Sequence, residues 1–138
     1  MLEVGNTTAT VLAANEKIPF NTVFINTNNR TSFDQANNAM LIKKRGVYKA
    51  GGSFVFTPTA AGLASIAMYV NGSAVPTAVA SFTAVAGNTY TFTIPSKYIR
   101  TVPSGVGNTV PITFVTSVDG TLVSANAFVY YNEVSNAE

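Results

Sequence analysis

Six carboxylates are the side chains of this 138-residue chain that could most directly perform acid–base or metal chemistry. Hydrolysis of a glycosidic bond needs two carboxylates facing each other across a sugar, and a calcium loop needs them at alternate positions. The six are scattered along the chain without either spacing, and three of them lie near a terminus. We therefore interpret them as structural or solvated groups: Glu3, Glu16, Asp34, Asp119, Glu133 and Glu138.

Other catalytic chemistry is excluded by residue types that the chain lacks. It contains no His and no Cys, so neither a histidine-based triad nor a thiolate metal site or disulfide can form. Ser96 and Lys97 are adjacent and do not have Ser-x-x-Lys spacing, and no glycine-rich phosphate loop is present. We predict that the protein is not an enzyme, with no cofactor and no catalytic, cofactor-binding or metal-ligating residue.

The densest charge cluster is the run Lys43, Lys44 and Arg45, followed closely by Lys49. Such a run can contact an acidic partner, for example a capsid protein or a glycan. The competing interpretation is a solvated strand end whose charge discourages edge-to-edge pairing. A nucleic-acid partner is disfavoured, because the net charge is only +2 and the chain has no Trp.

The composition predicts one all-β domain whose surface is too large for its few charged side chains to cover. Apolar residues make up 47% of the chain and charged residues 10%, against about 25% charged residues in an average protein. Thr and Val favour strands, whereas Asn and Gly favour turns. A folded chain of this mass exposes roughly 6,900 Å², so we expect part of that area to be buried against another subunit.

The clearest strand signal is the segment from Gly46 to Thr57. Its aromatic residues alternate with polar ones at period two, which is the strand pattern. Gly51 and Gly52 interrupt the alternation and predict a bulge or a sharp bend. The predicted inward face consists of Tyr48, Ala50, Phe54 and Phe56, and the outward face of Lys49 and Ser53.

Shorter alternating segments predict about eight to ten antiparallel strands in a single-domain jelly-roll sandwich. Asn71-Gly72 and Asp119-Gly120 are hairpin signals, Pro95 is expected to end a strand, and 26–38 is expected to be a loop. Residues 1–17 are predicted to be an N-terminal arm or first strand, and residues 18–138 the sandwich. The other expected strands are 10–14, 19–25, 40–43, 62–71, 74–82, 88–94, 110–117 and 121–134.

Three short motifs resemble the trimeric jelly-roll heads of the tumour necrosis factor and complement globular-head superfamily, most closely the phage and bacterial surface versions. They are Gly46-Val47-Tyr48 with the later Phe54-Val55-Phe56, the strand from Ile66 to the Asn71-Gly72 turn, and Phe128-Val129-Tyr130-Tyr131. Asp119-Gly120 has the reverse order of the Gly-Asp turn common in complement-type heads. The resemblance implies a compact homotrimer whose last strand lines the threefold axis.

The alternation of residues also predicts which side chains would meet at a subunit interface. Tyr69 falls on the face opposite Met68 and Val70, and Tyr131 falls opposite Tyr130. The last strand is apolar on both faces, which requires a partner on each, and Tyr is enriched at interfaces. The predicted trimer interface is therefore Tyr69, Ala125, Ala127, Val129 and Tyr131.

These observations favour a non-enzymatic virion structural protein, a capsid decoration or head fibre located at the virion surface. Its expected partners are its own copies and a major capsid or fibre protein bound through residues 1–17. No secretion signal, stalk or apolar span is evident, so no membrane partner is expected.

The main alternative is a receptor- or glycan-binding tip domain of a phage fibre or bacterial surface protein, and an assembly scaffold is also possible. The loops at 26–38 and 101–109 contain no aromatic residue except Phe33. This disfavours the stacking of sugars on loop aromatics and leaves recognition of a host protein open.

Overall fold

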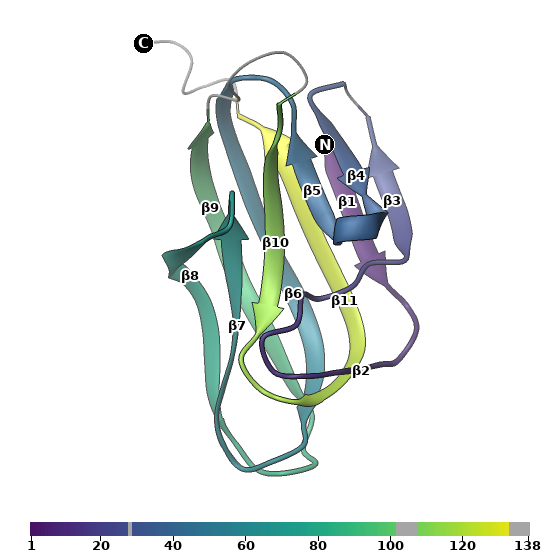
Figure 1. Cartoon of the computed structure of the whole chain (residues 1–138), viewed down its shortest axis with the longest axis vertical. Helices are drawn as coiled ribbons and strands as arrows, with labels where there is room; N and C mark the ends of the chain where they lie inside the picture. The colour runs from purple at the N-terminus through teal and green to yellow at the C-terminus, as the bar shows by residue number, and fades with distance from the viewer. Residues whose placement is uncertain (28, 102–107, 133–138) are drawn as a thin grey trace.

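A computed structural model describes residues 1–27, 29–101 and 108–132. Two antiparallel sheets pack face to face, with β7 and β10 of one lying over β6 and β11 of the other (Figure 1). This confirms the prediction of an all-β sandwich. The described part of the chain forms eleven strands and one short 3₁₀ turn.

The first sheet has six strands, with the order β3-β1-β11-β6-β9 and with β2 also paired to β11. Its long central pair is β6 and β11, which run antiparallel from Gly120 opposite Pro58 to Tyr131 opposite Tyr48. The strands are β1 (Leu2–Asn6), β2 (Thr10–Leu12), β3 (Thr22–Asn26), β6 (Gly46–Pro58), β9 (Tyr90–Thr101) and β11 (Gly120–Tyr131).

The second sheet has five strands in the order β4-β5-β10-β7-β8. The 3₁₀ turn η1 (Gln35–Asn37) connects its first two strands, and the Asn71-Gly72 hairpin connects β7 to β8 as predicted. The strands are β4 (Thr31–Asp34), β5 (Ala39–Ile42), β7 (Gly62–Val70), β8 (Ser73–Ala84) and β10 (Val110–Thr116).

Aromatic side chains fill the space between the sheets. Phe54 of β6 and Phe114 of β10 contact each other across the two layers, with ring centroids 4.9 Å apart. Tyr48, Phe54 and Phe56 are fully buried, whereas Lys49 and Ser53 are only partly covered. The predicted inward and outward faces of β6 are therefore confirmed, and so is the bulge, which lies opposite β9 between Ala50 and Gly52.

Two glycines leave room for these rings. A Cβ at Gly52 would lie 2.7 Å from Cζ of Phe54, and one at Gly120 would lie 2.5 Å from Cζ of Phe56 and 2.5 Å from the carbonyl oxygen of Thr57. The outer edges of both rings therefore lie directly against glycine backbone. This close approach explains why neither position carries a side chain.

The N-terminal segment is part of the sandwich. β1 lies between β3 and β11, and the side chains of Leu2 and Val4 are fully buried. Residues 1–17 are predicted to be an N-terminal arm or a first strand; in the structure they contain β1 and β2, and the apolar side chains of β1 lie in the core.

Two other expectations are wrong at sheet edges. Pro95 does not end the strand: β9 continues through it, because β9 is an edge strand, where a proline is tolerated. Pro76 likewise lies within β8, which is an edge strand of the second sheet. The expected loop at 26–38 contains β4 and η1. The segment is rich in Asn, which favours turns, but part of it forms the short strand β4, which pairs with β5.

Replacement of Gly120 by alanine is expected to lower the free energy of unfolding by about 1–3 kcal/mol, the usual cost of overpacking a filled core. The new methyl group would press against both the Phe56 ring and backbone. Denaturant unfolding at one fixed protein concentration measures the change. Ser124→Ala on the same strand is the control and should unfold close to the unchanged protein; equal stability of both variants would contradict the packing argument.

Candidate functional site

The described carboxylates stabilise local structure. Oδ1 of Asp119 accepts a hydrogen bond from the backbone N–H of Ala14 at 2.7 Å, and Oε1 of Glu16 accepts one from the N–H of Ala13 at 2.8 Å. Oε2 of Glu3 accepts from the amide of Asn126 on β11 at 2.7 Å. Residues 1–27, 29–101 and 108–132 contain no cluster of three metal-ligating side chains. Glu133 and Glu138 lie outside the described residues.

The outer face of the first sheet carries aromatic side chains. The rings of Phe128 and Tyr130 stack on β11 with centroids 6.0 Å apart and planes at 22°. Phe128 lies over Gly51, and Phe24 of β3 lies over Gly5, with 49% of Phe24 exposed. Lys49 Nζ is 4.9 Å from the ring centroid of Tyr98, which is 63% exposed. We call Phe24, Tyr98, Phe128 and Tyr130 the aromatic face.

The predicted interface residues on β11 are wrong, because they point inward. A bulge between Leu122 and Ser124 reverses the alternation along the rest of the strand. Ala125, Ala127 and Val129 are consequently buried in the core of the chain and have no surface to offer a partner. Phe128 and Tyr130, on the opposite face of β11 from Ala127 and Val129, point outward.

The two tyrosines of the predicted interface lie on different surfaces. Tyr69 is half-buried on the second sheet, paired with Thr113. Tyr131 lies at the end of β11, where its ring contacts Tyr48 at 5.5 Å between centroids and the guanidinium of Arg30 lies 3.8 Å above it. The five residues therefore do not form one surface. Tyr131 and Arg30 instead hold the end of β11 against the core.

A second apolar surface lies where β8 and β9 meet. Phe82 of β8 stacks on Tyr90 of β9, with ring centroids 5.2 Å apart, and contacts Phe92 at 4.9 Å. Phe82 is 38% exposed, and Val85, directly after the end of β8, is 58% exposed. We call Phe82 and Val85 the apolar edge.

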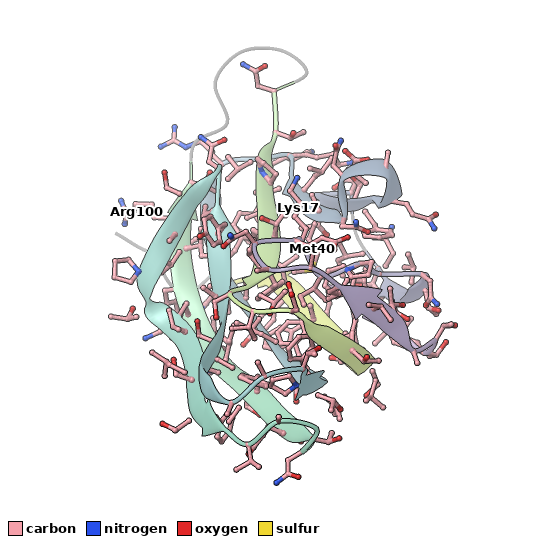
Figure 2. The ribbon with its side chains drawn as sticks, turned by 60° about the horizontal axis from the view of Figure 1, so that its bottom comes forward. Lys17, Met40 and Arg100 are labelled. Carbon is pink, nitrogen blue, oxygen red and sulfur yellow. The ribbon has the colours of Figure 1, made fainter. Side chains whose placement is uncertain are left out.

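The basic run lies in the loop between β5 and β6, at the opposite end of β11 from Asp119. Lys43, Lys44 and Arg45 are all exposed. The loop is held in place because the N–H of Lys43 donates to the Arg30 carbonyl at 2.7 Å and the Tyr48 hydroxyl donates to the Lys44 carbonyl at 2.7 Å. Its charges therefore project from a fixed backbone. Arg100 of β9 also points outward at the border of the molecule, in contrast to the buried Met40 (Figure 2).

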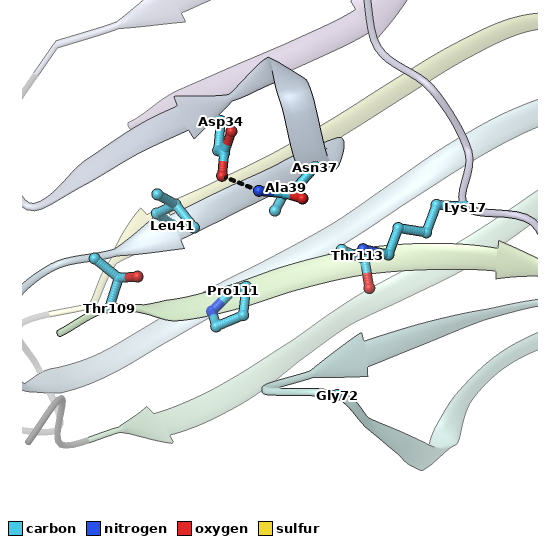
Figure 3. A pocket seen from close by; sticks show the side chains of 9 residues that line it. All are labelled: Lys17, Asp34, Asn37, Ala39, Leu41, Gly72, Thr109, Pro111 and Thr113. Carbon is cyan, nitrogen blue, oxygen red and sulfur yellow. Dashed lines mark hydrogen bonds between the residues drawn. The ribbon is translucent and has the colours of Figure 1, made fainter.

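The outer face of the second sheet contains a groove of about 340 Å³. Its floor consists of side chains from the outward faces of β5 and β10, where Leu41 pairs with Pro111. Figure 3 shows Asp34 and Leu41 on one side of β10 and the turn at Gly72 on the other. The described residues that line it are Lys17, Asp34, Asn37, Ala39, Leu41, Gly72, Thr109, Pro111 and Thr113.

The groove exists because β10 changes its neighbour. β10 pairs with β5 over Val110 to Ile112, and after this point Lys17 bridges to Val115 in place of β5. On the other side the N–H of Asn71 donates to the Pro111 carbonyl at 2.8 Å, which brings the β7–β8 turn against β10. Sequence reasoning missed this site, because its residues come from segments far apart in the chain.

No protein-family model and no curated protein matches the chain. The fold does match solved structures. One of them, described as the structure of Eiger TNF from S. frugiperda, superposes with a TM-score of 0.74 at 7% sequence identity, covering 95% of this chain and 90% of that chain. The chain thus has a jelly-roll fold similar to that of a tumour necrosis factor, the fold that the motif resemblance implies. No helix in the described residues is long and apolar enough to span a membrane.

Asp119 provides a test of the structural interpretation of the carboxylates. Asp119→Ala removes the acceptor for the Ala14 N–H and is expected to lower the free energy of unfolding by about 1 kcal/mol. Asp119→Asn keeps an acceptor oxygen and should recover most of that loss. Thermal or denaturant unfolding measures both variants, and an alanine variant as stable as the unchanged protein would contradict a structural role.

Proposed function

We propose that the protein is a non-enzymatic structural component of a phage virion, a capsid decoration or head fibre that assembles as a compact homotrimer at the particle surface. The observation that carries this proposal is the aromatic face, where large rings lie on the outside of the sandwich in a chain with only 10% charged residues. Exposed aromatic clusters of this kind mark interaction sites.

The positions of the two apolar surfaces support a closed ring. The aromatic face covers the first sheet, whereas the apolar edge lies where β8 meets β9. Contact between two different surfaces of identical chains is heterologous, and such contacts close into a ring when the rotation permits. Packing the edge of one copy on the face of the next would cover both, and the motif resemblance favours three copies.

We also propose a contact with the particle through the basic loop, in addition to the predicted contact through residues 1–17. Lys43, Lys44 and Arg45 project together from a fixed loop. In a trimer three such loops would lie at the same end of the assembly. The proposed partner is an acidic surface of a capsid or fibre protein, because clustered cations favour and steer such contacts.

The oligomeric state is the first test. Light scattering after size exclusion is expected to give a mass near three times 14.5 kDa. Phe128→Glu places a charge in the aromatic face and is expected to yield folded monomers. Tyr69→Glu, on the opposite side of the sandwich, is the control and should remain trimeric.

A monomeric unchanged protein would contradict the trimer. Dissociation by Tyr69→Glu without dissociation by Phe128→Glu would instead show that the interface lies on the second sheet. Circular dichroism distinguishes folded monomers from unfolded chains in each case.

The basic loop is tested by combining Lys43→Glu, Lys44→Glu and Arg45→Glu. The variant should keep the mass of the unchanged protein and lose binding to immobilised polyglutamate, and binding of the unchanged protein should weaken as salt is added. Stronger binding to DNA of equal charge than to polyglutamate would contradict an acidic protein partner.

The second candidate function is a receptor- or glycan-binding tip domain. The groove on the second sheet favours it, because it lies on the side of the sandwich that the proposed trimer leaves uncovered.

A further inference from the structure

We propose that the groove on the second sheet is a saccharide-binding site that accommodates one or two sugar rings. This inference rests on the second candidate function and gives it a location, a ligand class and residue roles. The volume of about 340 Å³ is at the lower end of the range of about 300–1,000 Å³ in which proteins bind small molecules.

The groove contains polar groups that the fold does not use. Thr113 is only 8% exposed, yet its hydroxyl has no hydrogen-bond partner among the described residues. No fully enclosed side-chain polar atom of those residues lacks a partner, so the hydroxyl must open to the groove that Thr113 lines. Buried polar groups normally have partners, and an unsatisfied hydroxyl at this depth is suited to a ligand.

Asp34 and Asn37 are held ready for hydrogen bonding. The amide of Asn37 donates to Oδ2 of Asp34 at 2.7 Å, across the first turn after β4 (Figure 3). This bond orients the carboxylate and leaves Oδ1 of Asp34 and the carbonyl oxygen of Asn37 as acceptors. Asp34 pairs with Ala39 at the edge of the floor, so both groups border the apolar surface.

The floor and the remaining wall complete the requirements for a sugar. Leu41 and Pro111 lie side by side and give an apolar platform, on which the C–H face of a pyranose can pack. Thr109 adds a hydroxyl, and Lys17 adds an ammonium group at the end where β10 leaves β5. A sugar ring presents C–H groups on its faces and hydroxyl groups around its rim. Its face can therefore pack on the apolar platform while its hydroxyl groups reach the polar groups of the groove.

Other ligand classes fit this arrangement less well. An apolar molecule would leave the Thr113 hydroxyl and the Asp34 carboxylate without partners, which is costly. A polyanion would be repelled by Asp34, and a divalent cation would be repelled by Lys17. A neutral sugar, or one whose single carboxylate lies against Lys17, satisfies both charges.

Affinity at one groove should be weak, because none of the described residues that line it is aromatic. The proposed trimer would present three grooves, and simultaneous binding of several sugars raises the apparent affinity without any new contact. Repeated glycans on a cell surface are therefore the form of ligand that this site fits best.

The experiment applies the intact protein to an array of neutral and acidic saccharides and then titrates the best binder by calorimetry. Thr113→Val keeps the shape of the side chain and removes the hydroxyl; it should weaken binding about tenfold, and Asp34→Asn by at least as much. Thr77→Val is the matched control on exposed β8 and should bind as the unchanged protein does. Lys17→Met should weaken binding of an acidic sugar more than of a neutral one.

Absence of binding to every saccharide on the array would overturn the proposal, and so would binding that Thr113→Val and Asp34→Asn leave unchanged. The molecular mass measured by light scattering tests the proposed trimer independently of sugar binding. A monomer that binds sugar through these residues contradicts only the trimer, whereas a trimer that binds no sugar contradicts only the groove.

Discussion

The contact between Phe54 and Phe114 is the interaction on which the rest of the structure depends, because it joins the two sheets at the centre of the sandwich. Gly52 leaves the room that the Phe54 ring needs for this contact. Gly120 does the same for Phe56. These close approaches favour a single pairing register between β6 and β11. That register decides which side chains of both strands point outward.

The sequence predicted strands best where one face is uniformly buried. The alternation from Tyr48 to Phe56 identified β6 and both of its faces, because burial on one side imposes period two. The same reasoning failed on β11, since the bulge after Leu122 adds one residue and exchanges the faces beyond it. Nothing in the local sequence marks that bulge: it depends on the pairing with Val55, which only the folded sheet provides.

The groove was beyond prediction for a different reason. Lys17, Asp34 and Thr113 stand far apart in the chain, and each by itself is an ordinary polar residue. They meet because β10 exchanges one neighbour for another along its length. The two proposed binding surfaces therefore lie on different sheets: one sheet carries the aromatic face proposed for self-association, and the other carries the groove proposed for a ligand. Assembly and ligand binding consequently need not compete for the same surface.

The prolines within β8 and β9 have a consequence for the size of any assembly. Both are edge strands, and an open edge ordinarily invites another chain to extend the sheet without limit. Pro76 and Pro95 each remove a backbone donor from these edges. Copies of the protein are thereby discouraged from joining strand to strand into a filament, and they are left to associate through side chains, in contacts that can end in a particle of fixed size.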